Sequence, residues 1–234
     1  MQLTDHGAAL FNPFPYAWEG KRGRAPDDVE FIEAFEAGAA EIRAALPGAA
    51  VVAYGLAEYR AVQEIRAFFE INARSEATFL RSVCPLILDR IRPCKEEQIE
   101  TKIFEHCAKH GVARKSFACI TALSCLYEDP HGDAYPIGRE VLKPSRDYSA
   151  KAAYNAVCDL RHMTLAIISG ALHGNQGFAL ATSDVGLASL SCALRPVGQL
   201  DKLGDIDVES ELAPELFPRL SSAGLKRLEQ LLRE

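Results

Sequence analysis

The fold is decided by one stretch near the carboxyl end of the chain, residues 149–198, whose sequence is SAKAAYNAVCDLRHMTLAIISGALHGNQGFALATSDVGLASLSCALRPVG. Its first part has the apolar spacing of a long helix that carries Asp159, and three glycines then turn the chain. A short apolar strand ends beside Asp184, and a second helix and a last strand follow. Helices that alternate with strands in this order predict an α/β fold built on a short parallel sheet.

Two acidic residues in this stretch have positions at which α/β folds bind ligands. Asp159 lies on the long helix, and Asp184 comes directly after the predicted strand 178–182. An acid on a helix and an acid after a strand can meet at the rim of the sheet, where open α/β folds place their ligands. Because carboxylate oxygens bind divalent cations, the sequence predicts a metal site formed by Asp159 and Asp184.

The order of elements in residues 149–198 resembles the last third of PIN-domain ribonucleases. The match consists of Asp159 within residues 155–162, NAVCDLRH, and of Asp184 within Thr-Ser-Asp after the apolar residues 178–181, FALA. In that family the equivalent segment supplies two of the metal-binding acids. The resemblance covers about a fifth of the chain. It implies a PIN-like three-layer α/β domain that is rich in helices and has an extended N-terminal arm.

The resemblance also implies an activity, the hydrolysis of RNA phosphodiesters with Mg²⁺ or Mn²⁺ bound by Asp159 and Asp184. Such a metal polarises the phosphoryl oxygen and lowers the pKa of a bound water. His162 lies one turn after Asp159, on the same side of the helix as Asn155, and would orient that water or contact a phosphate. Asn155 and four basic residues are the predicted substrate contacts, the basic ones being Lys143, Arg146, Lys151 and Arg161.

A second interpretation is a binding module without catalysis. PIN domains open with a strand that ends in an aspartate, whereas the best-fitting strand here, residues 51–55, carries no acid. Three glutamates are equally eligible as a further metal ligand: Glu96, Glu97 and Glu100. In this interpretation the chain is a catalytically lapsed PIN-like protein, or another α/β protein, that binds a protein or a nucleic acid.

Each candidate site residue also has a purely structural interpretation. Asp159 and His162 can form the solvated side of an amphipathic helix, because charged residues mostly lie on surfaces. Asp184 can cap the helix that follows it by accepting hydrogen bonds from the free amides of its first turn. His106 and His110 have the four-residue spacing of a metal pair, but they lack the glutamate of the H-E-x-x-H motif.

The chain is predicted to have three parts. Residues 1–27 form an arm rich in Pro, Gly and aromatic residues, and residues 28–200 form the PIN-like domain. Residues 201–234 combine an acidic segment with a C-terminal helix. The aromatic residues of the arm, from Phe11 to Trp18, either dock on the domain or stack on a single nucleic-acid strand.

The secondary structure of two segments in the predicted domain is inferred from their composition. The apolar run 116–127 favours a buried helix over a strand. Residues 128–148 contain three prolines and two glycines, and this composition predicts one long loop. Ser149 is then the expected N-cap of the long helix that carries Asp159.

Composition limits the partners of the chain. The formal net charge of −6 argues against a generally cationic nucleic-acid-binding surface, although a local basic patch is compatible with RNA binding. The seven cysteines include no C-x-x-C pair, and as core residues they suit a reducing cytoplasm. No apolar run is long enough to span a bilayer, and the first residues lack a signal-peptide pattern. The predicted partners are therefore RNA, another protein or a second copy of the chain, and no membrane.

Overall fold

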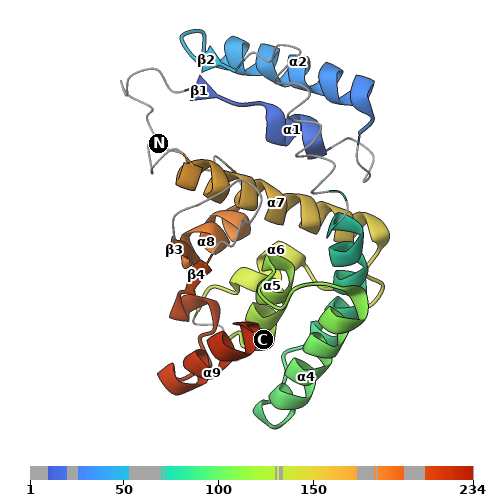
Figure 1. Cartoon of the computed structure of the whole chain (residues 1–234), viewed down its shortest axis with the longest axis vertical. Coiled ribbons are helices and arrows are strands. Elements are labelled where there is room, and N and C mark those ends of the chain that lie inside the picture. Colours follow the sequence, from blue (N-terminus) through green and yellow to red (C-terminus); the bar gives the residue numbers. More distant parts are fainter. Residues whose placement is uncertain are drawn as a thin grey trace. The chain divides into compact units, whose positions relative to one another are not determined.

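The structure is a computed structural model, and it describes residues 10–19, 26–52, 70, 72–129, 131, 134–172, 182, 184–197 and 209–233. The chain divides into two compact units, Met1–Asn72 (unit 1) and Ala73–Glu234 (unit 2). Figure 1 shows that most of the described residues lie in helices. This division differs from the predicted ones, which fell after residues 27 and 200.

Unit 1 consists of two helices and two very short strands: β1 Leu10–Phe11, α1 Phe14–Glu19, α2 Asp28–Ala45 and β2 Ala50–Val51. The side chain of Asp27 accepts a hydrogen bond from the Glu30 N–H, and the Glu30 side chain accepts one from the Asp27 N–H. This capping box fixes the start of α2. The buried rings of Phe14 and Phe31 meet edge to face, which packs α1 against α2.

Unit 2 is a helical assembly with one short ribbon of strands. Residues 72–83 are helical, and the labelled elements that follow are η1 Cys84–Ile87, α4 Pro93–His110, α5 Phe117–Leu126, α6 Ile137–Leu142, α7 Ala150–Leu172, α8 Val185–Ala193, β3 Leu194–Val197, β4 Glu209–Leu212, η2 Pro214–Leu216 and α9 Ser222–Arg233. Residues 118–126 of α5 are all buried, so this helix forms the centre of the core. The predicted buried helix over 116–127 is confirmed.

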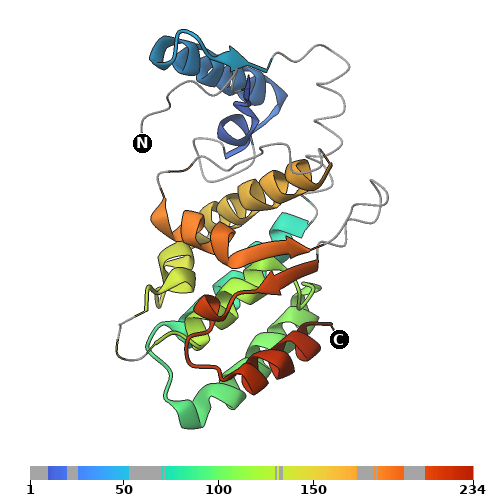
Figure 2. The ribbon, with the colours of Figure 1, turned by 90° about the vertical axis from the view of Figure 1, so that its left-hand side faces the viewer.

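The predicted α/β fold with a parallel sheet is wrong. Among the described residues, strands form only two pairs, the two-residue parallel pair β1–β2 and the antiparallel ribbon β3–β4 (Figure 2). β3 does lie within the predicted last strand, but its partner comes from the acidic segment after residue 200 and runs the opposite way. Residues 53–54 and 178–181, which belong to two other predicted strands, lie outside the described residues. The helices of unit 2 bury their apolar faces against one another, so they need no central sheet.

The prediction of one long loop over residues 128–148 is wrong in part, because this segment contains the helix α6. Its glycine and proline content had favoured a loop. Gly138 lets α6 approach α5 closely, since a Cβ atom at Gly138 would lie 2.6 Å from the Thr121 carbonyl oxygen. Gly186 plays the same part between α8 and α6, where an added Cβ would lie 2.8 Å from Cβ of Glu140. The two glycines allow α5, α6 and α8 to pack with their backbones in near contact.

The helix boundaries follow the caps that the sequence indicates. Ser149 accepts a hydrogen bond from the Ala152 N–H and precedes α7 as expected. Pro93 occupies the first turn of α4, because proline suits a position whose N–H has no partner within the helix. Within the described part of the chain, we find no helix that is both long and apolar enough to cross a membrane.

Candidate functional site

The long helix α7 presents a polar stripe, as its sequence predicts. Lys151 and Asn155 are exposed, and Asp159 and His162 are partly exposed. Spacings of four, four and three residues place these side chains one above another along one side of the helix. The opposite side is buried in the core through Ala153, Val157 and Leu160.

Two further predicted substrate contacts precede this helix. Lys143 ends α6 in the left-handed conformation, with φ of 48°, and its side chain is 69% exposed. Arg146 is exposed in the connection between α6 and α7. Among the described residues, Arg146, Lys151 and Asn155 have no side-chain hydrogen bond or ion pair, so their polar groups are available to a ligand.

Asp184 serves as the N-cap of α8. Its Oδ1 accepts a hydrogen bond from the Leu187 N–H at 2.9 Å, and its Oδ2 lies 3.5 Å from the Nζ of Lys143. The structural interpretation of Asp184 is therefore confirmed, and its side chain also contacts Lys143, another predicted site residue. The contacts of both carboxylate oxygens give Asp184 a structural role that requires no metal.

Around Asp159 and Asp184, the part of the chain that the structure describes supplies no set of metal ligands. Within the described residues, there is no group of three or more His, Cys, Asp or Glu side chains that can hold a metal ion. The site of Mg²⁺ or Mn²⁺ binding therefore stays a prediction from the sequence.

The side chain of Arg161 contacts other residues of the chain and is not available to a substrate. It is buried and forms an ion pair with Glu76 at 3.7 Å. Burial raises the pKa of Glu76, while the nearby Arg161 guanidinium opposes that change. Arg161 thus compensates a partly buried carboxylate between α7 and the helical residues 72–83.

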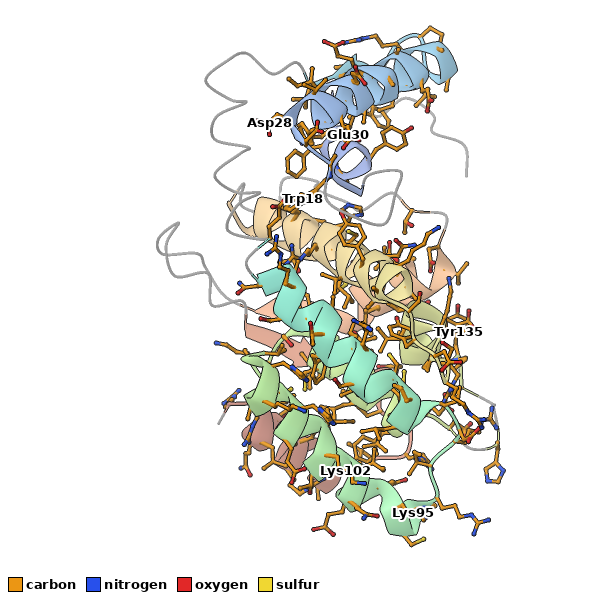
Figure 3. The ribbon with its side chains drawn as sticks, turned by 90° about the vertical axis from the view of Figure 1, so that its right-hand side faces the viewer. Trp18, Asp28, Glu30, Lys95, Lys102 and Tyr135 are labelled. Carbon is orange, nitrogen blue, oxygen red and sulfur yellow. The ribbon has the colours of Figure 1, made fainter. Side chains whose placement is uncertain are left out.

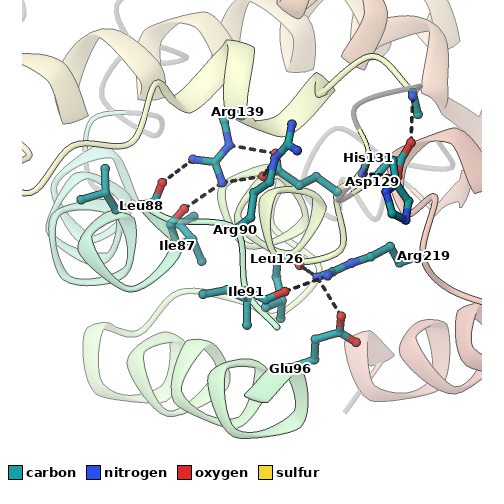
Figure 4. Close-up of polar contacts among 12 residues, drawn as sticks. Ile87, Leu88, Arg90, Ile91, Glu96, Leu126, Asp129, His131, Arg139 and Arg219 are labelled. Atoms are coloured by element: carbon teal, nitrogen blue, oxygen red, sulfur yellow. Dashed lines mark hydrogen bonds and ion pairs between the residues drawn. The ribbon is translucent and has the colours of Figure 1, made fainter. Parts of the chain in front are cut away.

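Two of the three glutamates that were eligible as further metal ligands are engaged in ion pairs. The carboxylate of Glu100 is buried and accepts hydrogen bonds from Tyr127 at 2.5 Å and from Arg227 at 2.7 and 2.8 Å. Glu96 pairs with Arg219 at 2.7 Å, as Figure 4 shows. These contacts join α4 to the C-terminal segment, so the two glutamates have structural roles.

A second arginine network, which the sequence analysis did not detect, lies at the end of α5. Glu128 is buried and binds the guanidinium of Arg139 through two hydrogen bonds of 2.8 Å. Arg139 also donates to the backbone carbonyls of Ile87 and Leu88, which end the helical turn η1. The sequence does show an acid, Glu128, after an apolar helix. Its partner Arg139 lies eleven residues later, and no helix or turn pattern predicts a contact at that spacing.

A serine, a cysteine and the His106–His110 pair belong to residue types that are common in catalytic or metal sites, and the structure gives each a defined position. Ser124 is buried in α5, so its hydroxyl does not reach a substrate. Burial raises the pKa of the Cys84 thiol to about 12, which keeps this group protonated and unreactive near neutral pH. The rings of His106 and His110 stack in parallel, 5.8 Å apart, and His110 Nε2 lies 3.1 Å from the Ser82 hydroxyl.

The aromatic residues divide into buried and exposed ones in a way that composition did not reveal. Phe14 and Trp18 are buried in unit 1, so neither ring is available to stack on a nucleic-acid strand. Tyr135, in contrast, is 44% exposed in the loop before α6, where Figure 3 shows its side chain. The sequence analysis overlooked Tyr135, although an aromatic residue in a loop rich in Asp, Gly and Pro is a signal for an exposed contact residue.

The chain matches no protein-family model, no curated protein and no solved structure in our comparisons. A functional proposal therefore depends on the chemistry of the residues described above.

Proposed function

We propose that the chain is an RNA-binding module that contacts the phosphodiester backbone through a basic stripe, defined as Lys143, Arg146 and Lys151, together with the neutral Asn155. The observation that carries the proposal is the exposure of all four side chains around the start of α7. Arg146 and Lys151 have no ion-pair partner among the described residues, so binding a phosphate would not require them to break one.

The local charge of the stripe supports an anionic ligand in spite of the net charge of the whole chain, which is −6. Residues 143–151 contain three basic side chains and one acidic side chain, Asp147. Affinity for nucleic acids is set by the cations that reach phosphates, and a local patch is sufficient for this purpose. The backbone N–H groups of the first turn of α7 add partial positive charge on the same side.

Binding without hydrolysis is the interpretation that the contacts of Asp184 favour. Its cap hydrogen bond and its ion pair with Lys143 explain the position of this carboxylate without a metal. The five buried cysteines support a reducing location such as the cytoplasm, because they are free thiols.

The proposal is tested by fluorescence anisotropy with a labelled single-stranded RNA of about 12 nucleotides. We expect the triple variant Lys143→Ala, Arg146→Ala and Lys151→Ala to lose most of the affinity. The slope of log K against log salt should become shallower by about 2, since each phosphate contact contributes roughly 0.7 for single strands. The matched control removes three exposed lysines from α4, namely Lys95, Lys102 and Lys109.

Equal loss of affinity in the two triple variants would contradict the proposal, because it would indicate attraction without a defined site. The same samples, incubated with Mg²⁺ or Mn²⁺, test hydrolysis. RNA cleavage that the wild type performs and that Asp159→Asn and Asp184→Asn abolish would establish the nuclease interpretation in place of a simple binding module.

A further inference from the structure

We infer that His106 and His110, in the last two turns of α4, form a chelating site for one divalent transition metal of the Zn²⁺ and Ni²⁺ class. Two histidines four residues apart on one helix face are the metal-binding part of the H-E-x-x-H motif. Imidazole is a ligand that Zn²⁺, Ni²⁺ and Cu²⁺ share. The pair has no residue in common with the basic stripe, so the inference is independent of the proposed function.

The two imidazole rings have a separation that suits a shared metal. Their centroids are 5.8 Å apart, and their planes differ by only 5°. Two nitrogen atoms that bind one Zn²⁺ at about 2.0–2.1 Å lie about 3–4 Å from each other. Since the nitrogens lie on the edges of the rings, rotation of the two side chains brings one nitrogen of each ring to that distance. The backbone of α4 need not move.

Each ring has a nitrogen that is suitable for binding the metal. Both side chains are partly exposed. Nδ1 of His106 is buried and has no hydrogen-bond partner among the described residues, so Nε2, on the other edge of the ring, is the coordinating atom. Nε2 of His110 lies 3.1 Å from the hydroxyl of Ser82. A metal replaces this single contact with a neutral side chain, so no ion pair is broken when the metal binds.

The end of α4 that carries the pair is held in place by the core and by its cap. Cys107, between the two histidines, is buried, and its carbonyl accepts a hydrogen bond from the Val112 N–H at 2.9 Å. Gly111 ends the helix in the left-handed conformation, with φ of 65°. Ligands on a fixed backbone lose little conformational freedom when they bind. The partial negative charge at the carboxyl end of a helix also favours a cation there.

The type of ligand selects the type of metal. Within the described residues, no group of three or more His, Cys, Asp or Glu side chains can hold a metal ion, so the pair supplies two nitrogen ligands and water completes the coordination. Mg²⁺ prefers oxygen ligands and keeps its own waters, so it should not compete for two imidazoles. The site therefore differs in its chemistry from the Mg²⁺ or Mn²⁺ site predicted at Asp159 and Asp184.

The test is isothermal titration calorimetry of the untagged protein with ZnCl₂ and NiCl₂ at neutral pH. Cys94→Ser and Cys192→Ser are present throughout, because the two exposed thiols would compete as metal ligands. We expect His106→Ala and His110→Ala each to weaken binding of one equivalent of metal by about 100-fold, since a single imidazole loses the high effective concentration of the second. The matched control is His162→Ala, because His162 is also partly exposed on a helix but has no histidine four residues away.

A second measurement leaves the histidines unchanged and so does not depend on the folding of the variants. Ni²⁺ is paramagnetic, and it should broaden the amide NMR signals of residues 106–110 before those of residues 159–162. Equal affinity of the parent protein and of both alanine variants would overturn the inference, and so would initial broadening around His162. Displacement of Zn²⁺ by excess Mg²⁺ would also overturn it, because it would indicate oxygen ligands.

Discussion

At the scale of single residues, each strongly buried carboxylate of unit 2 is accompanied by an arginine. Glu128 binds Arg139, and Glu100 binds Arg227. The cost of removing a carboxylate from water is large, and it is offset only when a cation and several hydrogen bonds are in place. Acids that looked like metal ligands in the sequence therefore hold secondary-structure elements together.

Arg139→Gln is expected to lower the free energy of unfolding by about 3–5 kcal/mol, because it leaves the buried Glu128 without its cation. The measurement is urea unfolding followed by far-UV circular dichroism. Arg90→Gln is the matched control, since Arg90 approaches the same carboxylate at 3.7 Å but is 52% exposed. The control should lose less than about 1 kcal/mol. Similar losses of unfolding free energy in both variants would show that the ion pair of Arg139 with Glu128 stabilises the protein no more than the exposed contact of Arg90 does.

At the scale of secondary-structure elements, the packing of unit 2 depends on close approaches between helices. Gly138 lies on α6 against the backbone of α5, where an added Cβ would lie 2.6 Å from the Thr121 carbonyl oxygen and 2.8 Å from the Cys125 nitrogen. Backbone atoms within a helix cannot move away as a flexible side chain can. The two helices would have to separate to admit a methyl group.

Gly138→Ala is therefore expected to destabilise the protein by about 1–3 kcal/mol, although alanine favours helices over glycine. Gly224→Ala in α9 is the control, because the nearest atom to its added Cβ is a leucine side-chain carbon at 3.4 Å. The control should be neutral or more stable by up to about 1 kcal/mol. The measurement is the thermal unfolding midpoint of both variants. A Gly138→Ala variant that is more stable than the wild type would contradict the close packing of α5 and α6.

The sequence predicts single helices better than it predicts their arrangement. The starts of α2, α7 and α8 were predictable because Asp27, Ser149 and Asp184 form caps with the first turn of the same helix. The presence of α6 was not predictable, since its formation depends on contacts with α5 and α8 that are distant in sequence. The sheet failed for the same reason: a short apolar segment does not specify which strand, if any, will pair with it.

For the candidate site, the sequence identified the exposed stripe on α7 through helical periodicity, and Lys151 and Asn155 are exposed as that interpretation requires. It could not determine that Arg161, on the same helix, is buried beside Glu76. Residues two positions apart on a helix, such as Asp159 and Arg161, face different directions, and only the packing of the neighbouring helices decides which direction is solvent.

At the scale of the whole molecule, unit 2 has one continuous hydrophobic core that extends from Phe79 to Leu232. Five of the seven cysteines are buried free thiols of unit 2, and they lie on η1, α4, α5 and α7: Cys84, Cys107, Cys119, Cys125 and Cys158. The other two, Cys94 and Cys192, are exposed. The thiols therefore provide natural probes of whether this core opens as a single unit.

We expect two thiols to react rapidly with a thiol reagent at pH 8 in the folded protein, and five to react only after unfolding. Burial raises the pKa of Cys84, Cys119 and Cys125, so these thiols stay protonated as well as inaccessible.

In increasing urea, the five protected thiols should become reactive together, in the same transition as the loss of circular dichroism. Mass spectrometry counts the modified cysteines, and a Cys94→Ser, Cys192→Ser variant should lose the rapid phase completely. If Cys84 or Cys107 reacted well before the others, the core of unit 2 would open in parts, and α5 would not organise it as one cooperative structure.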